Sequence, residues 1–308
     1  MRGLLAALAD IPGSHRVTVV ANTGDDLTLW GLRVCPDLDT LTYTLGGGIA
    51  EDQGWGRAAE SHVVRDELAA YAVLPTWFGL GDRDLATHLT RTALLAQGAS
   101  LSEATAVIAR RWGLAERGVR LLPMSDDPVE THLRIVDGEG ERTVHFQEYW
   151  VRLRAVPEVR EVLAVGAADA RPAPGVLEAI RDADAVLLPP SNPVVSVGTV
   201  LAVPGVRAAL EATSAPVVGI APLIGGSVVR GMADRLLPVL GVPVDAGAVA
   251  RHYGAALLDG WLVDEVDASL VPAVVAAGIP CRAVPLLMRD VPATAAMARA
   301  ALDLAGVS

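Results

Sequence analysis

Residues 17–44 read VTVVANTGDDLTLWGLRVCPDLDTLTYT, and the rest of the chain is organised around them. Residues 17–21 are apolar and mostly β-branched without alternation, which predicts a strand buried on both faces of a parallel sheet. Residues 22–24 (NTG) then end the strand. In an open α/β sheet the ligand crevice lies outside the carboxyl ends of the strands, so Asp25 and Asp26 fall where a site is expected.

Two further carboxylates, Asp37 and Asp39, follow in PDLDT at residues 36–40. Four carboxylates are thus concentrated just past one strand, at the usual place of a ligand site in such a sheet. The alternative is that Asp and Asn only form turns and helix caps here. For any one of these residues both interpretations stay open.

The composition favours a parallel sheet covered by helices. The chain has 308 residues and is 52% hydrophobic but only 4% aromatic, so its core is built mainly from Ala, Val and Leu. The formal net charge of -11 argues against binding to nucleic acid. Two unit charges about 4 Å apart interact by roughly 4 kcal/mol at an effective dielectric of 20. An anionic substrate beside the aspartates would therefore need a bridging cation, and a phosphate ester implies Mg²⁺.

The cysteines and the apolar runs predict a cytoplasmic protein. Cys35 and Cys281 form no CxxC pattern and are expected to be reduced thiols. The uncharged run 185–206 contains four prolines, which argue against a membrane helix. The first residues do not form a convincing signal peptide.

The order of the remaining segments predicts one α/β domain over residues 1–308. It is a Rossmann-like, doubly wound and mainly parallel sheet, with an inserted helical and β-hairpin region at about 55–155. We expect helices at 1–9, 58–73, 81–98 and 100–112, the last begun by a Ser100/Glu103 capping box. Further expected elements are strands at 119–124, 130–136 and 142–149, and a strand and helix alternation from the strand VLAVG (162–166) onward.

Three more loops are candidates for the same edge of the sheet. Arg83 lies in GDRD at a helix N-terminus, where backbone amides favour an anion, although a surface ion pair is the alternative. The other two loops are PPSNPVVSVG (189–198) and APLIGGSVVRG (221–231). Their candidate ligand residues are Ser191, Asn192, Gly225, Gly226 and Arg230, and the alternative for these loops is a simple turn.

The sequence lacks several well-known catalytic patterns. It contains no GxSxG, no Walker motif and no zinc-ligand spacing, so a nucleophilic enzyme is not indicated. A nicotinamide dehydrogenase has little support, because no GxGxxG follows a strand. His88 lies on a predicted helix and has no second histidine at metal-ligand spacing. The aromatic run HFQEYW (145–150) is expected on a strand, and core packing is the simpler interpretation of it.

Seven stretches occur along the chain in this order: NTGDD, LRVCPDLDTLTYTLGGG, WFGLGDRDLATHL, LLPMSDDPVETHL, HFQEYWVR, PPSNPVVSVG and APLIGGSVVRGMAD. Together they resemble the CofD family, the 2-phospho-L-lactate transferases of coenzyme F-420 biosynthesis. The resemblance covers nearly the whole chain and is strongest to the actinobacterial branch, named phosphoenolpyruvate transferases.

The resemblance implies a Mg²⁺-dependent transferase. The donor is a guanosine diphosphate ester of enolpyruvate or L-lactate, and the acceptor is the deazaflavin Fo (7,8-didemethyl-8-hydroxy-5-deazariboflavin). GMP leaves, and the product is dehydro coenzyme F-420-0 or F-420-0. The resemblance assigns Asp25 and Asp39 to Mg²⁺ and catalysis, with Asp39 as general base, and we also expect a homodimer. Substrate contacts are expected from Asp37, Asp39, Thr40, Arg83 and His88, and on the guanosine diphosphate side from Ser191, Asn192, Gly225, Gly226 and Arg230.

Two expectations qualify this resemblance. Family members begin with a strand and a Gly-rich loop of the GGVGGAR type, and this chain starts at the helix RGLLAAL that follows them. The N-terminal strand and Gly-rich loop are therefore expected to be missing here. The rival function is a CofD-like regulatory protein that binds a nucleotide sugar and has no transferase activity.

Overall fold

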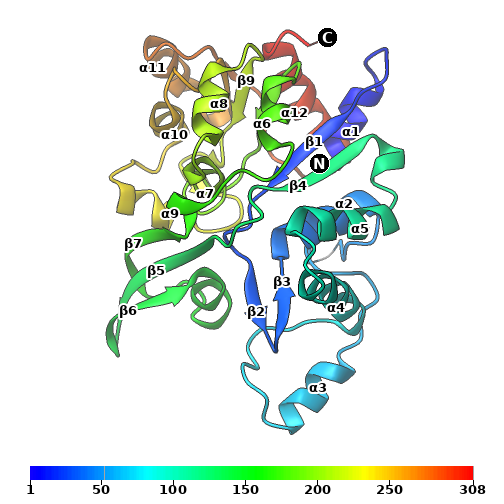
Figure 1. Cartoon of the computed structure of the whole chain (residues 1–308). Coiled ribbons are helices and arrows are strands. Elements are labelled where there is room, and N and C mark those ends of the chain that lie inside the picture. The colour runs from blue at the N-terminus through cyan, green and yellow to red at the C-terminus, as the bar shows by residue number, and fades with distance from the viewer. Residues whose placement is uncertain (52, 308) are drawn as a thin grey trace. The chain divides into compact units, whose positions relative to one another are not determined.

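A computed structural model describes residues 1–51 and 53–307, and its chain divides into two compact units. One unit combines Met1–His15 with Gly175–Ser308, and the other is Arg16–Pro174. We call them the terminal unit and the central unit and describe each by itself (Figure 1). The predicted single domain with an insertion at about 55–155 stays a prediction.

A four-stranded parallel sheet forms the core of the terminal unit. Its strand order is β13-β12-β9-β8, with bounds Cys281–Ala283, Gly260–Val263, Val217–Ile220 and Val186–Leu188. Every residue of β9 and β12 is buried, as an apolar strand covered on both faces should be. A small hairpin, β10 (Leu223–Ile224) with β11 (Ser227–Val228), follows β9.

Helices surround this sheet in the sequence order expected of α/β units. Gly3 lets α1 approach α12 closely, since a Cβ at this position would lie 2.5 Å from Thr294. The helices are α1 (Arg2–Ala9), α6 (Val176–Arg181), α7 (Val197–Ala202), α8 (Val206–Ala212), α9 (Ala233–Leu236), α10 (Ala246–Tyr253), α11 (Val271–Ala276) and α12 (Val291–Leu304). Short 3-10 turns occupy Ala167–Asp169, Pro238–Leu240 and Glu265–Leu270, the first of them in the central unit.

The central unit is built on a parallel pair of strands, β1 (Val17–Ala21) and β4 (Val119–Pro123). Beside it stand an antiparallel sheet of order β6-β5-β7 and a hairpin of β2 with β3. The bounds are β2 (Leu27–Leu29), β3 (Leu32–Val34), β5 (Glu130–Asp137), β6 (Gly140–His145) and β7 (Glu158–Val165). The helices are α2 (Pro36–Gly46), α3 (Val63–Ala70), α4 (Asp82–Ala96) and α5 (Leu101–Arg111), and α2 and α5 pack on β4 (Figure 1).

The structure confirms the predicted α/β class with parallel strands. The strand at 17–21 and the helices near 1–9, 81–98 and 100–112 are present. The capping box of α5 is complete, because the Ser100 side chain accepts from the Glu103 amide and the Glu103 carboxylate accepts from the Ser100 amide. Among the described residues, every helix is too short or too polar to cross a membrane.

Three predicted elements are wrong in detail. The helix expected at 58–73 begins only at Val63, where Asp82 accepts from the first amides. The run HFQEYW leaves the strand after its first residue, His145. The His145 ring accepts from the Gln147 amide, and the chain then forms a π-helical turn at Glu148–Arg152. VLAVG belongs to β7, a half-buried strand that pairs antiparallel with β5 and not with the parallel sheet.

Candidate functional site

The first turn of α2 presents two carboxylates in different directions. Pro36 suits the first helical position because its missing N–H would have no partner there, and acidic residues are favoured beside the positive end of a helix. Asp37 and Asp39 are two residues apart, and residues at that spacing do not face each other on a helix. The two side chains therefore join separate clusters.

The first cluster, which we call the Asp25 cluster, consists of Asn22, Asp25 and Asp37. The Asn22 amide group lies between the two carboxylates, with Nδ2 3.2 Å from Asp25 Oδ1 and 3.0 Å from Asp37 Oδ2. Its Oδ1 accepts from the Gly24 amide at 2.8 Å, which closes the turn after β1. The ion pairs of the described residues include no cationic partner for Asp25 or Asp37.

These carboxylates carry poorly compensated negative charge. Burial, and next the charge of Asp37, raise the pKa of Asp25 well above its ordinary value. Burial also raises the pKa of Asp37, against the hydrogen bond from Asn22. Neighbouring Asp26 is fully buried, and its desolvation raises its pKa to about 7 despite the ion pair with Arg33. A bound cation would relieve this arrangement.

The β5 and β6 strands hold the NTGDD loop in place. The Thr131 amide donates to the Gly24 carbonyl at 2.6 Å, and His145 Nε2 lies 3.2 Å from the Asp26 carbonyl oxygen. Because His145 Nδ1 accepts from the Gln147 amide, the proton of a neutral ring resides on Nε2 and is donated to Asp26. Gln147 Nε2 lies 3.4 Å from Asp25 Oδ2.

The second cluster, the Asp39 cluster, consists of Asp39, Arg91, His88 and Asp84. Arg91 Nη1 donates to Asp39 Oδ2 at 3.1 Å, and Nη2 donates to Asp39 Oδ1. His88 Nδ1 lies 3.5 Å from Asp39 Oδ2, and its Nε2 lies 3.4 Å from Asp84 Oδ2. Burial opposes the charge of Arg91, but the Asp39 carboxylate raises the pKa of Arg91, so the guanidinium stays charged.

Asp84 joins the Asp39 cluster to Tyr43 on α2. The Tyr43 hydroxyl donates to Asp84 Oδ1 at 2.5 Å and lies 2.8 Å from Thr87 Oγ1. Burial raises the pKa of Tyr43 far above its ordinary value, so its hydroxyl remains a donor. Burial opposes ionisation of Asp84, but the contacts with His88 and Tyr43 outweigh it and lower the pKa of Asp84.

The N-terminus of α4, predicted to favour an anion, binds a carboxylate of the chain itself. Glu60 accepts from the Arg83 amide at 2.7 Å and from the Asp84 amide at 2.8 Å. A Cβ at position 81 would lie 2.1 Å from Glu60 Cδ, so Gly81 makes room for this cap. The Arg83 side chain is exposed, and its role in binding a substrate stays a prediction.

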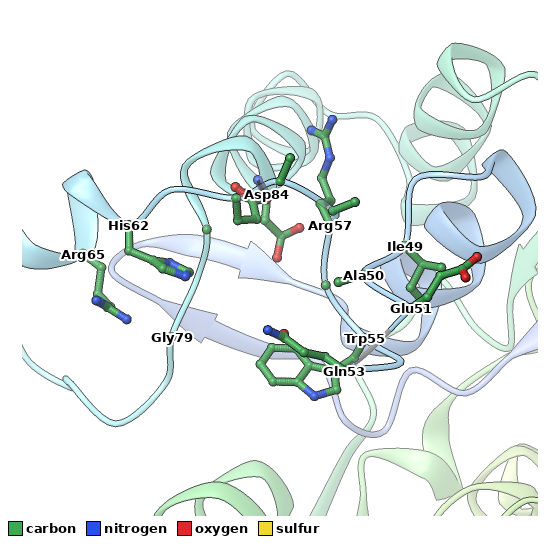
Figure 2. Close-up of a pocket in the computed structure, with 15 residues that line it drawn as sticks. Ile49, Ala50, Glu51, Gln53, Trp55, Arg57, His62, Arg65, Gly79 and Asp84 are labelled. Carbon is green, nitrogen blue, oxygen red and sulfur yellow. Dashed lines mark hydrogen bonds between the residues drawn. The ribbon is translucent and has the colours of Figure 1, made fainter.

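A cavity of about 590 Å³ adjoins Asp84, within the usual size range of ligand pockets. Figure 2 shows the side chains of Gln53, Trp55, His62 and Asp84 around one opening. Arg57 also lines it, and its guanidinium stacks on the rings of Trp112 and Tyr43, 5.0 and 5.7 Å from their centroids. The cavity therefore combines a flat aromatic surface with hydrogen-bonding groups.

The remaining candidates lie in the terminal unit. Asn192 Oδ1 accepts from the Val194 and Val195 amides, so it closes the turn before α7, and Ser191 is half-buried beside it. Gly225 and Gly226 both have positive φ, 58° and 71°, and form the tight turn of the β10–β11 hairpin. The Gly225 amide donates to Asp267 Oδ2 at 2.9 Å. Arg230 is exposed in the segment before α9.

Two groups of side chains are candidates for a metal ion. Asp39, Asp84 and His88 each offer a ligand atom, and these atoms lie within 4.8 Å of one another. The buried Nε2 of His88 makes no hydrogen bond of good geometry among the described residues, although it lies 3.4 Å from Asp84 Oδ2. However, the charge of Asp39 is already balanced by Arg91, whereas the donors to Asp25 and Asp37 from the described part of the chain are side-chain amides. Mg²⁺ prefers oxygen ligands, so the Asp25 cluster fits it better.

The chain matches known proteins over nearly its full length. The model of the family described as 2-phospho-L-lactate transferase CofD matches residues 1–275. A protein named phosphoenolpyruvate transferase from Kitasatospora aureofaciens is 61% identical over 305 residues, which cover 99% of this chain and 93% of the relative. One of the same name from Mycolicibacterium smegmatis is 54% identical over 310 residues, covering 99% and 92%. The chain belongs to the CofD family.

A solved structure supports the fold independently. A crystal structure of a UPF0052 family member from Bacillus halodurans superposes with a TM-score of 0.61 and covers 98% of this chain and 94% of its own. At 18% identity this likeness shows the fold alone.

Several residues at the site carried no usable signal in the sequence. Arg91, Tyr43 and Glu60 are far along the chain from the groups they contact, and each type is common on protein surfaces. Gln147 lies in the HFQEYW run, whose polar members could have been read as site residues. For Arg91, the only available clue was its spacing of three from His88, which places both on one face of α4.

The neutral state of His145 predicts a pH dependence of folding stability. Burial, the largest cause, lowers the pKa of His145 below its ordinary value of 6.5. The contribution of neutral His145 to the free energy of unfolding is therefore fully present above pH 6.5. It is lost as the pH falls toward the pKa of the folded state, because the unfolded chain binds the proton more readily. The loss is at most about 1.4 kcal/mol per pH unit.

We expect wild type to lose more unfolding free energy than His145→Gln between pH 7.5 and pH 5.5, measured by urea denaturation. Glutamine can donate to the Asp26 carbonyl but does not titrate. The difference between the two proteins isolates His145 from the aspartates, whose raised pKa values act in the opposite direction. Parallel pH profiles for the two proteins would contradict the neutral assignment.

Proposed function

We propose that this chain transfers the phosphoenolpyruvyl or 2-phospho-L-lactyl group from its guanosine diphosphate ester to the deazaflavin Fo. GMP leaves, and the product is dehydro coenzyme F-420-0 or F-420-0. The identity of 61% over 99% of the chain with a protein named phosphoenolpyruvate transferase carries this proposal. The arrangement of acidic clusters and cavity in the central unit supports it.

Fo would occupy the cavity beside α4. Its ring system is flat and heteroaromatic, and Trp55 and Arg57 offer surfaces on which it could stack. Thr40, Arg83 and His88 are proposed contacts, together with Asp37 and Asp39 at the start of α2. Of these, Thr40 and Asp37 are half-buried, Arg83 is exposed, and His88 and Asp39 are buried.

In the proposed reaction the terminal ribityl hydroxyl of Fo attacks the phosphorus that bears the enolpyruvyl or lactyl group. A P–O bond forms to the ribityl oxygen, the P–O bond to GMP breaks, and GMP departs with its oxygen. The hydroxyl proton passes to the Asp39 carboxylate and from there to solvent. Holding the two reactants in line accounts for most of such a rate enhancement.

Mg²⁺ is proposed to bind beside the NTGDD loop and neutralise the phosphate charge. The predicted ligand pair was Asp25 and Asp39, and the contacts favour Asp25 with Asp37. Asp39 has both oxygens hydrogen-bonded to Arg91 and is better suited to act on the hydroxyl. Among the described residues Asp25 and Asp37 have no such partner, so a divalent cation there would remove repulsion without breaking an existing ion pair.

The guanosine diphosphate side is assigned to the terminal unit. Ser191 and Asn192 offer short polar groups after β8, and Arg230 offers a guanidinium suited to phosphate. Gly225 and Gly226 would contribute backbone groups, although the Gly225 amide is hydrogen-bonded to Asp267. We further propose that the protein acts in the cytoplasm as a homodimer, which cell fractionation and sedimentation would test.

The purified chain should form coenzyme product from Fo. Incubation with Mg²⁺, Fo and each donor separately should give GMP and one new deazaflavin per productive donor, identified by mass. The two donors differ by two hydrogens, so the product masses separate them. If neither donor reacts and saturating Fo changes neither its own fluorescence nor the melting temperature, the nucleotide-sugar-binding regulator becomes the better assignment.

Asp39→Asn should abolish transfer while the protein remains folded. The substitution removes the proposed proton acceptor and one charge but keeps the volume, and we expect turnover to fall at least about 10²-fold. The matched control is Asp303→Asn on an exposed position of α12, which should turn over like wild type. Steady-state kinetics and circular dichroism check both; near-normal turnover by Asp39→Asn would move the base elsewhere.

Mg²⁺ should raise the melting temperature of wild type relative to EDTA. At a free concentration one hundred times its dissociation constant, an ion bound only by the folded state stabilises it by about 2.7 kcal/mol. Asp25→Asn should lose this response, yet be at least as stable as wild type in EDTA because a repulsive charge is gone. Loss of the response in Asp84→Asn but not in Asp25→Asn would place the ion with Asp39, Asp84 and His88.

A further inference from the structure

Arg91 is an arginine buried inside the central unit. Its side chain is 1% exposed, and it lies on α4, 52 residues after the Asp39 that it pairs with. Nη1 and Nη2 each donate to a different oxygen of the Asp39 carboxylate. Nη1 also lies 3.3 Å from the Arg33 carbonyl oxygen and 3.3 Å from His88 Nδ1.

This arrangement is expensive for folding. Removing a guanidinium and a carboxylate from water is unfavourable, and apolar residues of similar volume often stabilise a protein as well or better. The buried Nε of Arg91 has no hydrogen-bond partner among the described residues, which adds to the penalty. A contribution to stability is therefore a weak explanation for an arginine at this position.

The two-point contact of Nη1 and Nη2 with Asp39, which we call the fork, fixes the orientation of the carboxylate, and a simple charge does not. Two parallel N–H groups fix the plane of a carboxylate, whereas an ammonium group is a point charge that leaves the carboxylate free to rotate. In Asp39 each oxygen has one lone pair engaged by Arg91, so the orientation of the remaining lone pairs is set. Asp39 itself is 4% exposed and lies in the first turn of α2.

The guanidinium is in turn held by neighbours on α4. His88 Nδ1 lies 3.3 Å from Arg91 Nη1 and 3.5 Å from Asp39 Oδ2, and its Nε2 lies 3.4 Å from Asp84 Oδ2. Asp84 is fixed by the Tyr43 hydroxyl and lines the cavity. A continuous series of contacts thus connects the cavity wall to the orientation of Asp39.

We propose that Arg91 is a positioning residue, which orients the Asp39 carboxylate toward the acceptor hydroxyl through a two-point hydrogen bond. The inference rests on the proposed function, since it assumes that Asp39 receives the proton of that hydroxyl. Arg91 touches no substrate. It acts on the chemical step and not on the binding of Fo.

Arg91→Lys tests this distinction, because lysine keeps the charge and loses the fork. We expect kcat to fall about 10²-fold, as for a misplacement near 1 Å, while the dissociation constant of Fo from fluorescence titration stays within threefold of wild type. The matched control is Arg142→Lys, which replaces an arginine paired with Asp137 on the β5–β6 hairpin, and its kcat should not change. Equal kcat in Arg91→Lys and wild type would overturn the proposal.

Arg91→Ala provides the second test by chemical rescue. Guanidinium at millimolar concentration can enter the space that the side chain leaves and restore the two-point contact, so kcat should rise at least tenfold. Methylammonium at the same concentration and ionic strength should not restore it. Equal rescue by both ions would show that charge alone matters and would overturn the proposal, as would failure of both Arg91 variants to fold.

NMR signals of the Arg91 side chain test this inference without enzyme turnover, so they can be interpreted even if the proposed function is wrong. In wild type, rotation of the Arg91 guanidinium should be slow, so that its Nη–H groups give separate ¹⁵N–¹H signals. The loss of these signals in Arg91→Lys assigns them to Arg91. In Asp39→Asn the rotation should become fast and the signals should merge into one average. Their presence in a protein that transfers nothing would contradict the function and leave the fork intact. Averaged signals in wild type would overturn the positioning role.

Discussion

The burial of several carboxylates behind β1 and at the start of α2 is the constraint on which the central unit depends. A buried carboxylate is tolerated only when hydrogen bonds or an opposite charge compensate it. The chain uses two different solutions within one helical turn. Asp39 is paired with a buried guanidinium, while Asp37 and Asp25 share the amide group of Asn22 and have no cationic partner in the ion pairs of the described residues.

These two solutions suit two different tasks. The Asp39 pair is complete in the protein alone, so its carboxylate can be held in one orientation without any ligand. In the Asp25 cluster, burial raises the pKa of both carboxyl groups, and the charge of Asp37 adds to this effect at Asp25, so a bound cation would stabilise their charged forms. In the proposed transfer, Asp39 would accept a proton and the Asp25 cluster would hold a cation that offsets the phosphate charge.

Much of the fold follows from local sequence. An apolar β-branched run that ends in NTG predicted β1, Pro36 with acidic neighbours marked the start of α2, and Ser100 with Glu103 marked the start of α5. The family motifs predicted the chemistry. Local patterns gave the wrong element bounds where a distant contact decides them. Helix α3 begins only at Val63, whose amide donates to Asp82. Strand β6 ends at His145, whose ring contacts the Asp26 carbonyl and accepts from the Gln147 amide.

The sequence by itself thus determined the α/β class and the family, and it located the carboxylates in the stretch from β1 to α2. Only the tertiary structure decided which carboxylate has which partner. The partners of Asp39 and Asp25 include Arg91 and Gln147, 52 and 122 residues away, and no periodicity relates them. Side-chain direction on a helix separates Asp37 from Asp39. The packing of α4 then places Arg91 against Asp39, and the segment after β6 places Gln147 near Asp25. Charge compensation at such distances depends on three-dimensional packing, which local propensity does not encode.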